Sequence, residues 1–282
     1  MNSQATLPNR IRKQLPGSVW IVTGSSRGIG RETARMLVDC GARVVLHGRS
    51  SDRLIQLCEQ WPADSVTWKT GDIADPATAE TLVATAIAVF GRLDGVIANA
   101  GVSMRGRFSQ LQPEVMQQVV GTNLLGTAYT LQAALPRLRE SSGRAVTVSS
   151  LAGLRGFPNV SIYSAARMGI TGLVESVRAE HSSDPIHLAL IALGFTENDP
   201  DKEIMQADGS AVRHSRQAAS SQQQAAAAIV RAAYSRRWFH VTTTQGHLFR
   251  FANRWLPELT GWILRRSGGK LHNSSVQTAS SD

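Results

Sequence analysis

The sequence predicts an α/β fold in which helices cover both faces of a doubly wound, parallel, seven-stranded sheet. Short runs rich in aliphatic residues alternate with longer runs of helical periodicity, which is typical of repeated strand–helix–strand units. A glycine-rich turn joins the first strand to the first helix. Ligands of such sheets bind beyond the carboxyl ends of the strands, so we expect the functional residues there.

The predicted elements alternate along most of the chain. Strands are expected at 19–22, 43–46, 66–70, 95–98, 144–149, 187–191 and 239–243. Helices are expected near 29–40, 52–61, 76–90, 113–120, 124–140, 161–181 and 222–237.

The chain is predicted to form a single domain with an extension at each end. Residues 1–17 form the first extension, 18–246 the α/β domain, and 247–282 a basic, aromatic extension and tail. The polar segment at about 195–221 is too long for a turn, so it is either a functional lid or a disordered loop, and we favour the lid. The last residues, 271–282, are expected to be disordered.

The chain is basic, with 30 lysines and arginines against 21 aspartates and glutamates, which gives a formal charge of +9. This charge fits an anionic cofactor, an anionic membrane surface or nucleic acid, but no nucleic-acid-binding motif accompanies it. No apolar run approaches the roughly 18 residues of a membrane span, and the start of the chain lacks a signal peptide's apolar core. A cytoplasmic protein is expected. Cys40 and Cys58 lack metal-ligand spacing, so no metal site is expected.

The first strand continues into the turn 23–30, which opens a helix. Glycines permit a tight turn and a close approach of the backbone to a pyrophosphate, and the helix N-terminus supplies free N–H groups. Glycines also occur in plain strand-to-helix loops, but this context favours a dinucleotide site. The candidate binding residues of the turn are Gly24, Ser26, Arg27, Gly28, Ile29 and Gly30.

The turn has the pattern T-G-x-x-x-G-x-G and resembles the cofactor motif of the short-chain dehydrogenase/reductase family. Asp72, which precedes Ile73, is similar to the family's adenine-contacting aspartate. Asn99 and Gly101 belong to an N-A-G motif similar to the one that steadies the family's sheet beside the cofactor. The resemblance extends over about 18–243 and implies a Rossmann-type domain that transfers hydride between a nicotinamide cofactor and a carbonyl or alcohol.

The choice of cofactor can be argued from charge. Enzymes that bind NAD place an acidic residue at the end of the second strand, and those that bind NADP place a basic residue there to meet the 2′-phosphate. Here the strand ends with His47, Gly48 and Arg49, without a carboxylate. Arg49 and Arg27 can each form a charge-assisted fork with a phosphate, although either alone could be a solvated surface charge. Together they predict NADP(H).

Ser150 and Tyr163 resemble the catalytic pair of the family. The resemblance implies that Tyr163 is the general acid in reduction and the base in oxidation, that Ser150 bonds the substrate oxygen, and that Asn123 carries a water-linked proton relay. Seen alone, Ser150 could be a helix-capping hydroxyl and Tyr163 a half-buried helix tyrosine. Their joint occurrence at the family's spacing favours catalysis.

One departure concerns the family pattern Tyr-x-x-x-Lys, because Arg167 stands in place of the lysine. Residues four apart on a helix share a face, so the cation still lies beside the phenol and can lower its pKa. Arginine has a longer, planar fork and cannot release a proton. A non-catalytic NADP-binding protein is therefore the main alternative to an enzyme.

A second departure follows the sixth strand, where the family commonly has Pro-Gly and this chain has Leu193 and Gly194. Gly194 keeps the backbone near the nicotinamide amide. Thr196 or Asn198 can supply the polar contact that the family makes with a threonine.

The substrate can be described only by class, as a lipid-like or acyl compound. Arg105 and Arg107 could receive an anionic head group or be solvated loop residues. An apolar wall or ordinary core could be formed by Met104, Leu154, Phe157, Ile162 and Phe195. The resemblance also implies a homodimer or homotetramer that pairs through the helices carrying Asn123 and Tyr163.

The segment 247–271 interleaves aromatic and aliphatic residues with arginines, which suits the headgroup boundary of a membrane. The same residues could instead cover the substrate cleft or a subunit interface. Pro257 interrupts the pattern, so at most two short helices are expected.

Overall fold

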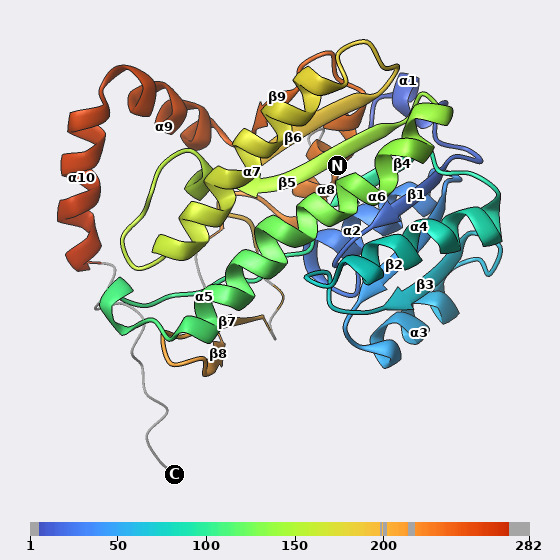
Figure 1. The fold of residues 1–282 in the computed structure, drawn as a ribbon. Helices are drawn as coiled ribbons and strands as arrows, with labels where there is room; N and C mark the ends of the chain where they lie inside the picture. Colours follow the sequence, from blue (N-terminus) through green and yellow to red (C-terminus); the bar gives the residue numbers. More distant parts are fainter. Residues whose placement is uncertain (1–5, 198, 200–201, 214–217, 271–282) are drawn as a thin grey trace.

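The computed structural model describes residues 6–197, 199, 202–213 and 218–270, with side chains described as far as residue 266. Seven parallel strands form the central sheet, in the order β3-β2-β1-β4-β5-β6-β9. They are β1 (Val19–Val22), β2 (Arg43–Gly48), β3 (Val66–Thr70), β4 (Gly95–Ala98), β5 (Arg144–Ser150), β6 (His187–Leu193) and β9 (Phe239–Val241). The predicted doubly wound sheet is confirmed, and its strand order reverses between β1 and β4 (Figure 1).

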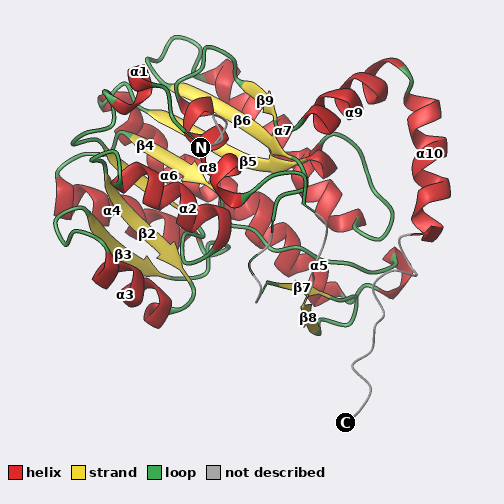
Figure 2. Ribbon diagram, turned by 180° about the vertical axis from the view of Figure 1, so that it is seen from behind, coloured by secondary structure: helices red, strands yellow, loops and turns green. Residues whose placement is uncertain are grey.

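Helices cover both faces of the sheet (Figures 1 and 2). One face carries α2 (Gly28–Val38), α3 (Ser51–Gln60) and α8 (Gln222–Ala233), and the other carries α4 (Pro76–Phe90), α6 (Gly126–Glu140) and α7 (Ser161–Glu180). Successive side chains of β1 point to opposite faces of the sheet, so the core has two parts. Trp20 and Val22 pack on the first face, and Val19 and Ile21 pack on the second. A further helix, α5 (Pro113–Val120), packs through Val115 and Val119 against Met104.

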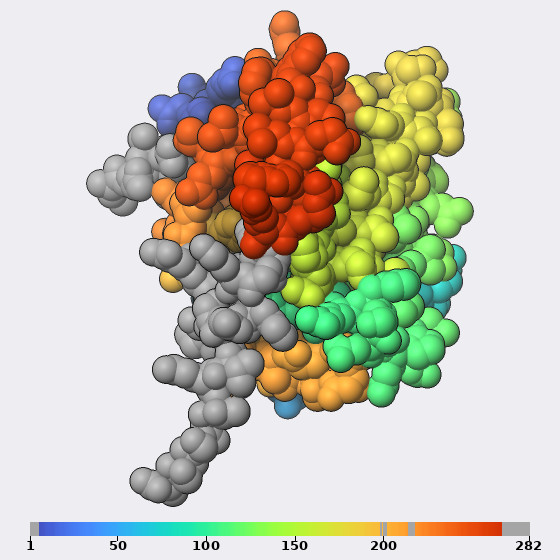
Figure 3. All heavy atoms as spheres, turned by 90° about the vertical axis from the view of Figure 1, so that its left-hand side faces the viewer, coloured from blue at the N-terminus to red at the C-terminus, as the bar shows by residue number. Residues whose placement is uncertain are grey.

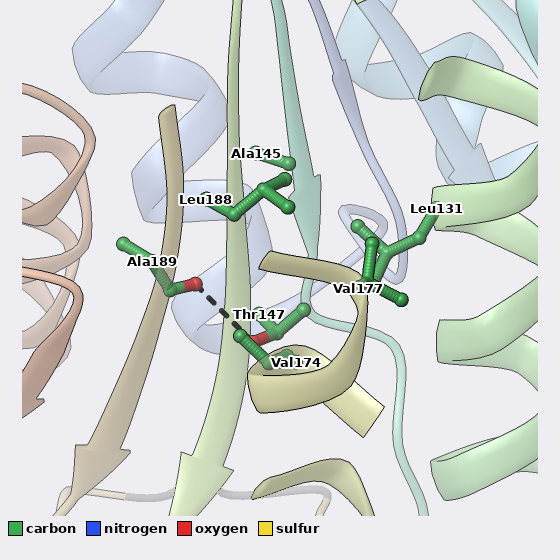
Figure 4. Close-up of a pocket in the computed structure, with 7 residues that line it drawn as sticks. All are labelled: Leu131, Ala145, Thr147, Val174, Val177, Leu188 and Ala189. Atoms are coloured by element: carbon green, nitrogen blue, oxygen red, sulfur yellow. Dashed lines mark hydrogen bonds between the residues drawn. The ribbon is translucent and has the colours of Figure 1, made fainter. Parts of the chain in front are cut away.

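The packing of α6 and α7 on the sheet is tight (Figure 4). Leu131 of α6 and Val174 and Val177 of α7 meet residues of β5 and β6, and the space between them is too small for a water molecule. The hydroxyl of Thr147 is satisfied there by the carbonyl of Ala189 at 3.2 Å. This part of the second face is therefore core and not a ligand site.

The residues before β1 complete the core of the first face. They contain the short helix α1 (Asn9–Arg12), and Leu7, Ile11 and Leu15 are buried in the cluster that includes α2 and α8. The segment predicted as an N-terminal extension thus packs, over its described residues, as part of the domain.

Several predicted boundaries differ from the structure. The helix expected at 124–140 is preceded by a π-helical turn, Gly121–Leu125, and the helix expected at 222–237 ends at Ala233. The last strand ends at Val241 because Thr243, at φ 67°, caps the next helix by accepting a hydrogen bond from the N–H of Gly246 at 3.1 Å. That helix begins within the domain predicted to end at residue 246.

The segment 195–221 contains a hairpin that the sequence analysis did not predict. Its strands are β7 (Glu203–Met205) and β8 (Ala211–Arg213), which pair antiparallel. Bridges join Met205 to Met104 and Ser220 to Thr196. Whether this segment acts as a lid stays a prediction.

The C-terminal helices are α9 (Thr244–Trp255) and α10 (Pro257–Lys270), which project from the side of the body (Figure 1). Pro257 separates them, as expected. The loop after β5 holds α9: Phe249 stacks on Phe157 with ring centroids 5.4 Å apart, and Asn253 bonds both Arg155 and the carbonyl of Leu154. The tail 271–282 lies outside the described residues.

Candidate active site

The candidate site lies where the carboxyl ends of β1, β4 and β5 meet, beside the reversal of strand order. β1 leads into the glycine turn, β4 ends before Asn99, and β5 ends at Ser150. Parallel strands bring these residues to one edge of the sheet although they are far apart in sequence.

The glycine turn can accept a pyrophosphate. Gly24 and Gly28 have φ values of 66° and 59°, in the left-handed region that favours glycine. Helix α2 begins at Gly28, and no side chain caps its N-terminus, so its first N–H groups can meet an anion. At Gly30 a β-carbon would overlap the carbonyl oxygen of Gly24 and lie 2.6 Å from Nδ2 of Asn99. Only glycine fits this position.

Asn99 and Thr23 brace the turn against β4. Asn99 Nδ2 donates to the carbonyls of Thr23 and Gly24 at 3.0 and 3.2 Å. The hydroxyl oxygen of Thr23 accepts from the backbone N–H groups of Asn99 and Ala100, both at 3.0 Å. Asn99 thus holds the turn in place, and its predicted role beside a cofactor stays a prediction.

His47 is a residue of this region whose role the sequence analysis missed. Its Nδ1 accepts from the N–H of Gly24 and its Nε2 donates to the carbonyl of Gly71, both at 3.2 Å. Burial lowers the pKa of His47 to about 4, against the opposing effects of Gly71 and Asp72, so the ring stays neutral at neutral pH. The signal in the sequence was a single histidine near the end of an otherwise apolar strand. In the structure its side chain connects the glycine turn to the residue that follows β3.

The basic residues predicted to hold a 2′-phosphate lie beside the end of β2. A β-carbon on Gly48 would lie 2.8 Å from the hydroxyl oxygen of Ser26, so the glycine turn and the end of β2 adjoin. Arg49 is exposed and Arg27 half-buried. Arg49, the residue after Gly48, therefore follows the point where β2 adjoins the turn that contains Arg27.

Asp72 and Ile73 follow β3 but differ in their surroundings. Asp72 is exposed and accepts from the N–H of Ala74 at 3.0 Å. Ile73 is buried in the core of the second face, so only its backbone is available to a cofactor.

Ser150 and Tyr163 are brought together as predicted. The Ser150 hydroxyl caps the turn that follows β5, accepting from the N–H of Ala152 at 3.3 Å. Burial alone would raise the pKa of Tyr163, but the positive charge of Arg167 and a hydrogen bond from Ser150 outweigh it, so the pKa falls below its ordinary value. The charge of Lys202 adds to this lowering, and no sequence signal identified Lys202. The phenol is therefore disposed to exchange a proton.

Arg167 lies beneath the tyrosine ring, with its guanidinium carbon 5.1 Å from the ring centroid. The group is buried, and its Nη1 donates to the carbonyl of Val148 at 2.8 Å. Its Nε is also buried and has no partner among the described residues. An unsatisfied buried donor is costly, and an oxygen of a bound nicotinamide riboside would satisfy it. Gly101 makes room for this side chain, because a β-carbon there would overlap the guanidinium.

Asn123 is fully buried within the π-helical turn, and its amide is committed to structure. Its Oδ1 accepts from the N–H of Val102 at 3.2 Å, while its Nδ2 donates to the carbonyls of Val102 and Val119 at 3.0 and 2.9 Å. The backbone carbonyl of Asn123 accepts from Thr127 at 2.8 Å. The side chain thus holds the loop after Gly101, and the predicted proton relay stays a prediction.

Asp199 lies at the opening of α2, which sequence reasoning did not anticipate. A β-carbon on Gly28 would lie 3.1 Å from a carboxylate oxygen of Asp199. The carboxylate accepts from Gln222 at 3.1 Å and pairs with Arg31 at 3.7 Å. A carboxylate is favourable at a helix N-terminus, and a pyrophosphate bound at the same N-terminus would compete with Asp199 for this position.

Of the residues predicted after β6, Gly194 and Thr196 lie at the site's edge. The N–H of Gly194 donates to the hydroxyl of Thr242 at 2.8 Å, and the buried Thr196 hydroxyl bonds the carbonyl of Gly194 at 3.2 Å. Asn198 lies outside the described residues.

The residues expected to form an apolar wall differ in their exposure to solvent. Met104 is buried, and Ile162 packs with Tyr163 in the same cluster, while Phe195 is 48% exposed. The backbone N–H of Arg105 donates to Met205 of the hairpin. Among the described residues, no group of three or more histidines, cysteines, aspartates or glutamates is placed to hold a metal ion.

The sequence and the fold resemble those of known proteins. Residues 18–209 match the family model described as short chain dehydrogenase. A dehydrogenase/reductase SDR family member 7B from Bos taurus is 32% identical over 210 residues, 71% of this chain and 65% of the bovine protein. An uncharacterized oxidoreductase from Staphylococcus saprophyticus is 31% identical over 196 residues, 67% of this chain and 80% of that protein. The 11-beta-hydroxysteroid dehydrogenase 1A from Arabidopsis thaliana is 31% identical, and the match spans 66% of this chain and 54% of that protein.

Solved structures show the same fold at lower identity. A short-chain dehydrogenase/reductase from Burkholderia phymatum in complex with NAD has a TM-score of 0.76 at 20% identity, covering 87% of this chain and 95% of that one. An alcohol dehydrogenase from Thermococcus sibiricus complexed with 5-hydroxy-NADP has a TM-score of 0.67 at 22% identity, covering 80% and 94%. The family model covers more than half of the chain, and with it the glycine turn and the Ser150–Tyr163 pair. The chain belongs to the short-chain dehydrogenase/reductase family of oxidoreductases.

Proposed function

We propose that this chain is an NADP(H)-dependent enzyme that interconverts a ketone or aldehyde and an alcohol. The observation that carries the proposal is the contact of Tyr163 with Ser150 and Arg167, which lowers the pKa of the phenol despite its burial. Proton exchange at a substrate oxygen requires such a group within hydrogen-bond reach. The bound nicotinamide supplies the hydride chemistry.

The chain's own residues then have separate tasks. Tyr163 donates its proton to the carbonyl oxygen in reduction and takes it back in oxidation. The Ser150 hydroxyl donates to the same oxygen and stabilises its developing charge. Arg167 stabilises the phenolate, and Asn123 fixes the loop on which Gly101 adjoins the guanidinium.

NADPH is expected to bind at least about tenfold more tightly than NADH, because a charged contact to the 2′-phosphate contributes about 1.5–3 kcal/mol. Titration of both cofactors by intrinsic tryptophan fluorescence measures the preference. In Arg49→Ala the preference for NADPH should fall, since the 2′-phosphate then keeps only Arg27.

Arg43→Ala is the matched control, because Arg43 begins the strand that ends beside Arg49 and its guanidinium lies over the ring of Phe90, 5.9 Å from the centroid. Both variants lose one positive charge. Equal affinities for the two cofactors in the wild type, or equal losses in the two variants, would overturn the assignment of NADP(H).

The alternative function is non-catalytic binding of NADP. The hydrogen bond and close packing that fix the side chain of Arg167 favour this alternative. Arg167 already donates to Val148 and is confined beside Gly101, so it has less freedom than a lysine to move with a proton relay. Such a protein would bind the cofactor and turn nothing over.

Arg167→Lys is expected to keep or raise activity, because lysine preserves the charge and has the compact head group of the family. Arg167→Met should lower kcat, since it removes the charge that favours the phenolate. The assay is NADPH oxidation against a panel of ketones, aldehydes and 3-oxoacyl compounds. If neither the wild type nor Arg167→Lys oxidises NADPH with any compound of the panel, while both bind NADPH tightly, the non-catalytic alternative holds.

The proposed substrate is lipid-like or acyl. The apolar side chains Phe157 and Ile162 lie on the segment between Ser150 and Tyr163, and Phe195 is exposed. The Arabidopsis relative is named as a hydroxysteroid dehydrogenase, which is consistent with an apolar carbonyl substrate. Arg105 and Arg107 could meet an anionic head group.

We also propose a homodimer or homotetramer and a peripheral contact with a membrane. Leu125, at the start of α6, and Met168, on α7, are 41% and 46% exposed, which suits pairing through these helices. The exposed apolar residues of α9 and α10 suit a membrane surface. Among the described residues, no helix has the length and hydropathy needed to cross a bilayer. The cytoplasmic location stays a prediction.

A further inference from the structure

A cavity of about 470 Å³ lies outside the catalytic pair, between the loop after β5, the first half of α7 and helix α10. Arg155 and Ser161 line one part of it, and Leu264 and Arg265 of α10 line another. Ser150 and Tyr163 are not among its lining residues. The proposed oxidoreductase activity does not use this cavity.

Two guanidinium groups converge at the cavity. A β-carbon built on Gly261 would lie 2.8 Å from Nη2 of Arg155 and 3.6 Å from Nη1 of Arg265. Nη1 of Arg155 donates to Asn253, and neither arginine has an acidic partner among the described ion pairs. Two positive charges this close repel one another. An anion bound between them would remove this repulsion and accept charge-assisted hydrogen bonds from both guanidinium groups.

The N-terminus of α7 faces the same cavity. No side chain caps this 20-residue helix, and its first turn contains no acidic residue. Ser161, its first residue, has a buried Oγ without a hydrogen-bond partner in the described part of the chain. A buried hydroxyl without a partner is unusual, and here it lines the cavity beside the positive end of the helix dipole. These groups together form a site for an anion.

Much of the remaining cavity lining and the surface around it are apolar. Phe157, Pro158, Met168 and Leu264 line it. Outside it, α9 and α10 expose Leu248, Phe251, Trp255, Leu256, Leu259, Trp262 and Ile263, each between 44% and 68%. The two helices form one side of the molecule, next to the yellow-green segment that includes the start of α7 (Figure 3). An exposed apolar surface of this extent indicates a binding partner.

The charge of the two helices indicates what that partner is. Their described side chains include Arg250, Arg254, Arg265 and Arg266 against Glu258 alone. A second copy of this chain would present the same positive charge, whereas a surface of anionic lipid presents the opposite charge together with an apolar interior. We propose that α9 and α10 lie on an anionic bilayer and that the cavity receives the phosphate of one phospholipid headgroup.

This inference rests on the proposed membrane contact and is independent of the proposed oxidoreductase activity. Full-length protein is sedimented at low salt with vesicles of equal parts phosphatidylglycerol and phosphatidylcholine, and with vesicles of phosphatidylcholine alone. The wild type should sediment with the anionic vesicles. Arg265→Gln should weaken this binding about tenfold, because it removes a charged hydrogen bond to the headgroup.

Arg266→Gln is the matched control, because its guanidinium lies 4.0 Å from the ring centroid of Trp262 and it does not line the cavity. It removes the same charge from the same helix. Ser161→Asp places a carboxylate where the phosphate would lie, in the first turn of α7 where the helix dipole favours a negative charge. It should therefore abolish the preference for anionic vesicles without lowering the melting temperature. Ser161→Ala controls for loss of the hydroxyl alone.

Equal losses in Arg265→Gln and Arg266→Gln would show diffuse charge attraction only and overturn the headgroup site. A wild type that ignores anionic vesicles would overturn the bilayer as the source. If the wild type does not bind these vesicles but inorganic phosphate raises its melting temperature, the site takes free phosphate instead. NADPH titration and the carbonyl assay on the same samples report separately on the oxidoreductase.

Discussion

Replacing Tyr163 with phenylalanine is expected to lower kcat by about 100- to 10,000-fold, the range that a positioned general acid or base contributes. The ring keeps its packing and its contact with Arg167, so the affinity for NADPH should stay nearly unchanged. Steady-state carbonyl reduction and fluorescence titration of NADPH measure the two quantities. A loss in kcat without a loss in binding assigns the hydroxyl to proton transfer.

The pH dependence of the wild type provides a second measurement of the same group. Arg167 and Ser150 hold the pKa of Tyr163 below its ordinary value of 10.0 against the effect of burial. A lower pKa means that the phenolate, which is the base in oxidation, forms at a lower pH. The kcat for alcohol oxidation should therefore rise with pH through a pKa below 10, and Tyr163→Phe should lose this rise.

Tyr234→Phe is the matched control for both experiments. Tyr234 packs against Trp20 and Arg144 on the first face of the sheet, away from Ser150. Its variant should turn over like the wild type. If Tyr163→Phe keeps more than about a tenth of the activity, the hydroxyl is not the proton donor, since the expected loss is at least about 100-fold.

Replacing Gly30 with alanine is expected to destroy cofactor binding and to destabilise the fold. The new methyl group would overlap the carbonyl oxygen of Gly24 and press on Asn99, so the turn and its brace cannot both keep their positions. Overpacking typically costs about 1–3 kcal/mol of stability. Urea unfolding should show this loss, and NADPH should no longer change the tryptophan fluorescence.

Gly172→Ala is the control, because nothing lies within 4 Å of a β-carbon at this exposed position of α7. It should leave NADPH binding unchanged and raise stability by about 0.5–1 kcal/mol, the helix propensity of alanine over glycine. Normal NADPH affinity in Gly30→Ala would mean that the glycine turn is not the pyrophosphate site.

The sequence determined the elements whose signals are local. The strands Val19–Val22, Val66–Thr70 and Gly95–Ala98 have the predicted bounds. The first and third are short apolar runs followed by polar residues, and the second is rich in residues with high β propensity and is followed by Gly71. The helices Pro76–Phe90 and Pro113–Val120 also agree, since a proline marks the start of each. The parallel direction of the strands followed from their alternation with helices, because parallel strands need crossover connections.

The sequence also determined which residues converge at the site. Gly24, Asn99, Ser150 and Tyr163 lie at one edge of the sheet because each follows the carboxyl end of a parallel strand or begins the next helix. The resemblance of their motifs to those of the family pointed to these residues, and their catalytic and binding roles stay predictions.

Only the tertiary structure decided what these residues contact. His47 joins Gly24 to Gly71, Asp199 reaches the start of α2, and the guanidinium of Arg167 fits against Gly101. The cavity beside Gly261 likewise needs α10 to meet the loop after β5. Periodicity and turn chemistry act within a few residues, whereas such contacts arise from the packing of segments that are far apart in the chain.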